Sequence, residues 1–170
     1  MAVLITVAVA VVVGLLNLGG IIDKVQGKLT AWKYQRLVEK MQAPYKNDKY
    51  GGKTPEETFD LFLDALRKED VDLASRYFVI PKQEGWKQSL GKLKEANLYK
   101  GMLSELEYAR VNWEGKTQEN EARFSYTVDV KEKQTLTLPD GSKSEFLPGK
   151  YGAEIIFEKY PSGVWKISIL

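Results

Sequence analysis

The spacing of hydrophobic residues changes along the chain, and each pattern predicts a different kind of structure. Residues 1–22 carry no charge and are almost entirely apolar. A run of about 20 such residues spans the roughly 30 Å hydrocarbon layer of a bilayer, so this segment predicts a transmembrane helix. Between residues 59 and 66 apolar side chains recur every three or four positions, as in a helix with one buried face. From residue 124 to 130 they alternate with polar ones, as in a half-buried antiparallel strand.

Capping and turn residues divide residues 54–170 into elements. Thr54 is a predicted N-cap, Pro55 occupies the first helical position and Glu57 can close a capping box. Asp70 can cap a second helix. Helices followed by strands predict an α+β domain with three helices and about five strands. We expect the later helices at 71–78 and 82–96, a turn at 99–106, strands at 108–113, 124–130, 133–138, 151–160 and 164–170, and turns at 114–116, 139–141 and 161–163.

Residues 23–53 are predicted to form a basic stalk helix that ends before Pro44, followed by a linker. They hold eight basic and three acidic residues, and no proline occurs from residue 23 to 42. Apolar residues recur in this stalk at spacings of three, four or six. Each such side chain gains about 1.5 to 3 kcal/mol when it is fully buried, so a partner is expected to cover them. The expected contact residues are Val25, Leu29, Trp32, Val38 and Met41.

Composition excludes several chemistries. The chain has no cysteine and no histidine, which removes the usual nucleophile–base arrangements and the commonest transition-metal ligands. Residues 54–170 hold 17 basic and 20 acidic residues, so the domain lacks the positive surface that a nucleic acid requires. We therefore predict no enzyme activity, no cofactor, no metal and no nucleic-acid partner.

Three stretches of the sequence resemble those of a known superfamily. They are the helix start Thr-Pro-Glu-Glu at 54–57, the stretch Phe-Leu-Asp-Ala-Leu-Arg-Lys-Glu-Asp at 62–70 and the terminal strand Gly-Val-Trp-Lys-Ile at 163–167. Over residues 54–170 the chain resembles the nuclear-transport-factor-2-like superfamily, in its small bacterial membrane-anchored or lipoprotein forms. The resemblance implies three helices on a curved sheet around a conical cavity. Enzymes of this superfamily place Asp, Tyr or His in the cone. Here Tyr77 and Tyr126 are possible cavity residues, whereas alternation places Asp129 on the outer face.

The favoured hypothesis is a membrane-anchored, non-catalytic scaffold or ligand-binding module of the bacterial cell envelope. It would be a single-pass protein whose partners are the lipid bilayer and other membrane or envelope proteins. The basic residues after residue 22 alone would place the domain in the cytoplasm, but the resemblance favours an extracytoplasmic domain. An alternative is a filament subunit that polymerises through its N-terminal helix, since that helix resembles type IV pilins. A third is a small-molecule isomerase or dehydratase.

Overall fold

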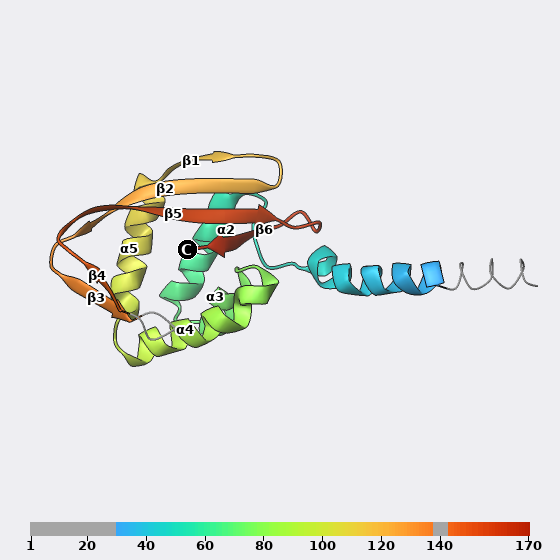
Figure 1. The fold of residues 1–170 in the computed structure, drawn as a ribbon, viewed down its shortest axis with the longest axis horizontal. Helices are drawn as coiled ribbons and strands as arrows, with labels where there is room; N and C mark the ends of the chain where they lie inside the picture. The colour runs from blue at the N-terminus through green and yellow to red at the C-terminus, as the bar shows by residue number, and fades with distance from the viewer. Residues whose placement is uncertain (1–29, 138–142) are drawn as a thin grey trace, which may run out of the picture. The chain divides into compact units, whose positions relative to one another are not determined.

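Figure 1 shows the computed structural model of the chain, which describes residues 30–137 and 143–170. The chain divides into two compact units, one ending at Pro44 and one running from Tyr45 to Leu170. The anchor expected over residues 1–22 lies outside the described residues, as do Val25 and Leu29. Within the described part of the chain, no helix is both long and apolar enough to cross a membrane.

The helices that follow residue 53 begin where the sequence provides caps. The Thr54 hydroxyl accepts a hydrogen bond from the Glu57 amide at 3.1 Å, and the Glu57 carboxylate accepts one from the Lys53 amide at 2.7 Å. The Asp70 carboxylate accepts from the Leu73 amide at 2.9 Å. These bonds satisfy amides that have no partner within a helix. The helices are α2 (Pro55–Arg67), α3 (Val71–Arg76), α4 (Gln83–Glu95) and α5 (Tyr99–Asn112), with a 3-10 turn at Ile80–Lys82.

The described strands form two antiparallel sheets, one of four strands in the order β1-β2-β5-β6 and one of two strands, β3-β4. In the longest pairing, Glu121 of β2 lies opposite Glu158 of β5, and the register continues to the other end of β2. The outer edge of β6 is covered, because the Val79 amide donates to the Ile167 carbonyl at 2.9 Å. The strands are β1 (Glu114–Thr117), β2 (Glu121–Val130), β3 (Gln134–Thr137), β4 (Lys143–Phe146), β5 (Gly149–Lys159) and β6 (Trp165–Ile169).

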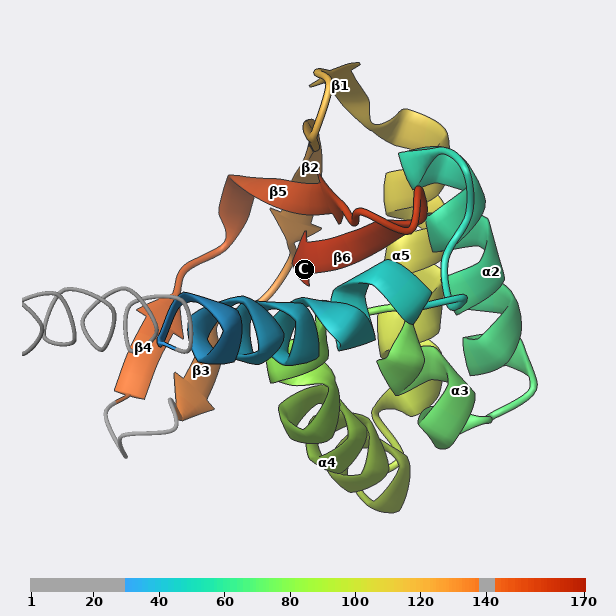
Figure 2. The ribbon, with the colours of Figure 1, turned by 90° about the vertical axis from the view of Figure 1, so that its right-hand side faces the viewer.

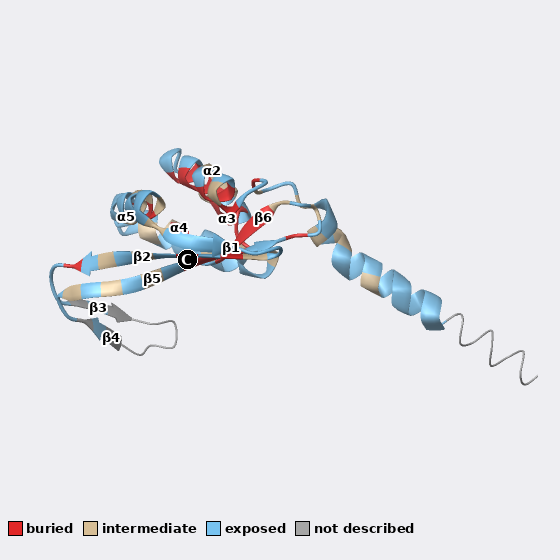
Figure 3. Cartoon of the chain, turned by 90° about the horizontal axis from the view of Figure 1, so that it is seen from above, coloured by how far each residue is buried: buried red, intermediate tan, exposed pale blue. Residues whose placement is uncertain are grey.

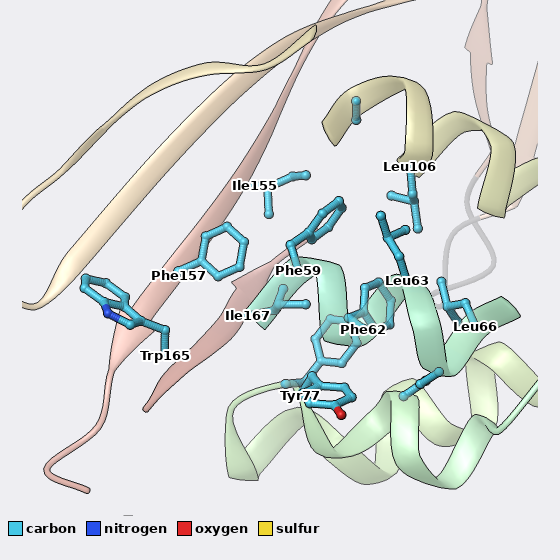
Figure 4. Close-up of a cluster of buried hydrophobic side chains, with 14 of the residues drawn as sticks. Phe59, Phe62, Leu63, Leu66, Tyr77, Leu106, Ile155, Phe157, Trp165 and Ile167 are labelled. Atoms are coloured by element: carbon cyan, nitrogen blue, oxygen red, sulfur yellow. The ribbon is translucent and has the colours of Figure 1, made fainter. Parts of the chain in front are cut away.

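The core lies between the four-stranded sheet and the helices on one side of it (Figures 2 and 3). Figure 4 shows how α2 projects Phe59 and Phe62 towards Phe157 of β5 and Ile167 of β6. All four of these side chains are fully buried. The apolar stripe predicted for the first helix is therefore its core face, and the α+β class with helices packed on an antiparallel sheet is confirmed.

The predicted element order is wrong in several places, and the described part of the domain has four α-helices where three were expected. Residues 108–112 of the segment predicted as a strand belong to α5, which is also much longer than the expected turn at 99–106, and Trp113 directly follows the helix. Arg110 holds this helix against α2 through two bonds to Asp60, at 2.7 and 3.0 Å. The predicted turn at 114–116 is strand β1. Its central Gly115 pairs closely with β2, since a Cβ there would lie 2.1 Å from the Arg123 carbonyl oxygen.

Candidate functional site

The two tyrosines predicted as possible cavity residues lie in different surroundings. Tyr77 is buried just after α3, where burial raises the pKa of its phenol and Asp64 and Asp70 raise it further. Tyr126 is half-buried in β2, where burial again raises the pKa of the phenol, with a smaller contribution from Glu105. The charged neighbours of the two phenols are thus different. Among the described hydrogen bonds, none joins the buried Tyr77 phenol to the half-buried Tyr126 phenol.

Aromatic rings fill the space between the helices and the sheet. Trp113 stacks on Phe124 with 4.3 Å between ring centroids, and Phe157 meets both rings edge-on at 6.1 and 5.8 Å. Phe59 reaches the same group, 5.0 Å from Trp113. Such offset and edge-on contacts are the favoured geometries of aromatic pairs. These rings therefore fill the space between α2 and the sheet, whereas Tyr126 lines a hollow at the surface together with Asn112, Ser125 and Thr127.

Several acidic side chains of the helices form surface ion pairs. Asp72 lies 2.5 Å from Lys87, and the hydrogen bond to this lysine lowers the pKa of the Asp72 carboxyl. Glu69 lies 2.8 Å from Lys94, whose hydrogen bond likewise lowers the pKa of Glu69. Among the described residues, no three acidic side chains gather in a way that could hold a metal ion. These carboxylates thus act as partners of lysines on a solvated surface.

A buried ion pair near the end of the chain is the feature that the sequence pattern missed. The Lys166 side chain in β6 is fully buried, and its Nζ lies 2.8 Å from Oδ2 of Asp48, itself almost completely buried. The ammonium also donates to the Tyr50 carbonyl at 2.8 Å and to the Arg76 carbonyl. Burial lowers the pKa of Lys166, and Asp48 opposes that shift. Three acceptors thus compensate for the lost hydration of the ammonium.

This ion pair fixes a segment that was predicted to be a linker. The Trp165 amide donates to the Gly52 carbonyl at 2.9 Å, and the ring of Tyr45 packs on Tyr160 with centroids 5.1 Å apart. Gly51 has φ +147°, and a Cβ there would lie 2.2 Å from the Trp165 carbonyl oxygen. Only glycine adopts this conformation without strain. Residues 45–52 therefore form part of the domain.

The stalk residues that are described do not share one side of their helix. Residues 30–47 are helical, so the prediction that this helix ends before Pro44 is wrong. Nine residues at about 100° each place Trp32 and Met41 on opposite sides. Trp32 is half-exposed, with the Arg36 guanidinium 4.4 Å above its ring. Val38 is partly buried, whereas Met41 is exposed. The three described members of the predicted contact set therefore do not lie on one side of the helix, and their contact with a partner stays a prediction.

Comparisons with known proteins do not add to this geometry. No protein-family model, no curated protein and no solved structure matches the chain. The resemblance to the nuclear-transport-factor-2-like superfamily therefore stays a prediction.

Proposed function

We propose that the chain is a membrane-anchored, non-catalytic scaffold of the bacterial cell envelope, built on a nuclear-transport-factor-2-like domain. The observation that carries the proposal is the filled interior, in which Phe59, Trp113, Phe124 and Phe157 contact one another. Because these rings occupy the space between α2 and the sheet, we place the contact with a partner on the outer surface of the domain. The uncharged run over residues 1–22 supplies the anchor, and the domain lies on the extracytoplasmic side.

The outer side of α5 offers a surface for a protein partner. Val111 is 82% exposed and Tyr108 is 54% exposed, and their spacing of three places them next to each other on the helix. Ser104 and Gly101 continue the same side towards the start of α5 and are also exposed. Small residues beside an exposed tyrosine give a partner close access, and tyrosine is enriched at protein interfaces.

The proposal predicts that a photo-crosslinker at position 108 captures one other envelope or membrane protein. A benzophenone amino acid replaces Tyr108 in the full chain, in native membranes, and the control places it at the exposed Lys92 of α4. We expect one hetero-product from position 108, none from position 92, and loss of the product with Val111→Asp. Val111 is so exposed that this change leaves the fold intact.

Two other outcomes would contradict the proposal. A ladder of products made of like subunits would favour the pilin-like filament. The absence of any product from position 108, with the protein present and folded in the membrane, would show that this domain has no scaffold contact at α5.

A further inference from the structure

The helix over residues 30–47 has one apolar side that is exposed. Tyr34, Leu37 and Met41 are 68%, 55% and 64% exposed. At about 100° per residue, these three side chains, Val38 and Tyr45 fall within an arc of about 100°. Tyr45, at the end of the helix, packs on Tyr160, so the exposed part of this side is the part before it. This side differs from the set predicted from the sequence, because it includes Tyr34 and Leu37 and leaves out Trp32.

The same helix carries mainly basic residues, and their position beside the apolar side favours an anionic membrane as its partner. Residues 30–47 contain four basic residues and one acidic residue. Lys33 and Lys40 lie along the edge of the apolar side next to Leu37, and Glu39 lies on the opposite side. An apolar side with lysines on its border is typical of a helix that lies in the headgroup layer of an anionic membrane, where the lysine stems reach up to the phosphates.

A second copy of the helix would be a poorer partner. A coiled coil requires the apolar positions to repeat every seven residues over several heptads. The positions seven residues before Tyr34 and Leu37 are Gly27 and Thr30, so the repeat does not continue towards the anchor. In a parallel pair of these helices, Lys33 and Lys40 of one copy would face Val38 and Tyr45 of the other. Neither of these residues is acidic, so the two lysines would have no ion-pair partner.

We propose that the helix over residues 30–47 lies in the headgroup layer of an anionic bilayer, with Tyr34, Leu37 and Met41 facing the acyl chains. The proposal rests on the proposed membrane anchor and names the surface that the chain contacts beyond it. Asp48 follows the helix directly and is bonded to Lys166 of the domain.

Site-directed spin labelling tests the proposal in the full chain. Because the chain has no cysteine, Met41→Cys and Glu39→Cys each give one labelling site, on the apolar and the polar side. In vesicles of phosphatidylcholine and phosphatidylglycerol, we expect the label at position 41 to be accessible to oxygen and shielded from a nickel chelate. The label at position 39 is expected to show the reverse. In vesicles of phosphatidylcholine alone, the contrast between the two positions should largely disappear.

Charge reversal at the border of the apolar side should release the helix. A lysine near an anionic surface contributes about fivefold to membrane affinity, so Lys33→Glu with Lys40→Glu is expected to lower the equilibrium constant between bound and free helix at least about 25-fold. The matched control, Lys92→Glu with Lys100→Glu, reverses two exposed lysines of the domain and should preserve the contrast between positions 41 and 39.

The outcomes that overturn this proposal are distinct from failure of the anchor. Equal accessibility at positions 39 and 41 in anionic vesicles would show that the helix does not lie on lipid. Spin–spin broadening between labels at position 41 would show that a second copy covers the apolar side. Flotation of each variant with the vesicles tests the anchor separately. A chain that floats but shows either of the first two results refutes only the lipid contact.

Discussion

Replacing Asp48 with asparagine is expected to lower the free energy of unfolding of residues 45–170 by about 3 to 5 kcal/mol, because it leaves a buried ammonium without its counter-ion. Lys166 is fully buried and lies 2.8 Å from the Asp48 carboxylate. The two carbonyls that remain, from Tyr50 and Arg76, are neutral acceptors. Urea titration of the two proteins measures the difference. A fragment of residues 54–170 lacks Asp48 and should lose at least as much.

A double-mutant cycle distinguishes the pair from general damage to the site. Lys166→Met removes the charge and keeps most of the stem, so it leaves Asp48 buried without a partner and should also destabilise. The double variant with Asp48→Asn and Lys166→Met buries no charge, and its loss should be smaller than the sum of the two single losses by about 2 kcal/mol or more. Strict additivity, or a loss below about 1 kcal/mol for Asp48→Asn, would contradict a buried ion pair.

Tyr160 is expected to make the domain sensitive to alkaline pH. Burial raises the pKa of its phenol to about 12, and its hydroxyl oxygen accepts a hydrogen bond from the Ile80 amide at 2.8 Å. The unfolded phenol titrates near 10. Between these values the folded state binds more protons than the unfolded state, so the stability that Tyr160 supplies is present below about pH 10 and is lost as the pH rises towards 12.

Comparison with Tyr160→Phe isolates this contribution. At neutral pH the variant should be less stable by about 1 to 3 kcal/mol, because the Ile80 amide loses its acceptor. From about pH 9 to 11.5 the wild type should lose about 2 kcal/mol more than the variant. Lys166 makes the free energy of unfolding rise with pH, because its pKa is lowered in the folded state. Since Lys166 is present in both proteins, its contribution cancels in the comparison. If the free energies of unfolding of the two proteins changed in parallel over this range, the pKa of the Tyr160 phenol would not be raised in the folded state.

Elements with local signals were predictable from the sequence. Thr54 and Asp70 cap helices because each side chain accepts from an amide only three residues later. The alternation in β2 also holds, with Phe124 buried and Asp129 exposed, because one face of this strand meets the helices and the other meets solvent. Where one side of an element is buried, the period of the pattern decides both its type and its orientation.

Features that depend on distant partners could not be predicted from the pattern. Tyr108, Val111 and Trp113 favour a strand locally, but Arg110 bonds to Asp60, 50 residues away, and holds the segment as helix. The Lys166–Asp48 pair joins residues 118 apart. Alternation would place Lys166 in solvent, and it gives no sign that residues 45–52 cover this side of β6. Tertiary contacts override local preference at both places.

Extraction of membranes with alkaline carbonate tests the central claim, a domain anchored in lipid by the first 22 residues, most directly. Full-length protein and a fragment starting at residue 30 are expressed in bacterial cells, and the membranes are washed with carbonate, which strips peripheral proteins. We expect the full-length protein to stay in the membrane pellet and the fragment to be released, because electrostatic contacts at the lipid surface alone do not withstand the wash. Release of the intact full-length protein into the supernatant would show that the first 22 residues do not span the bilayer.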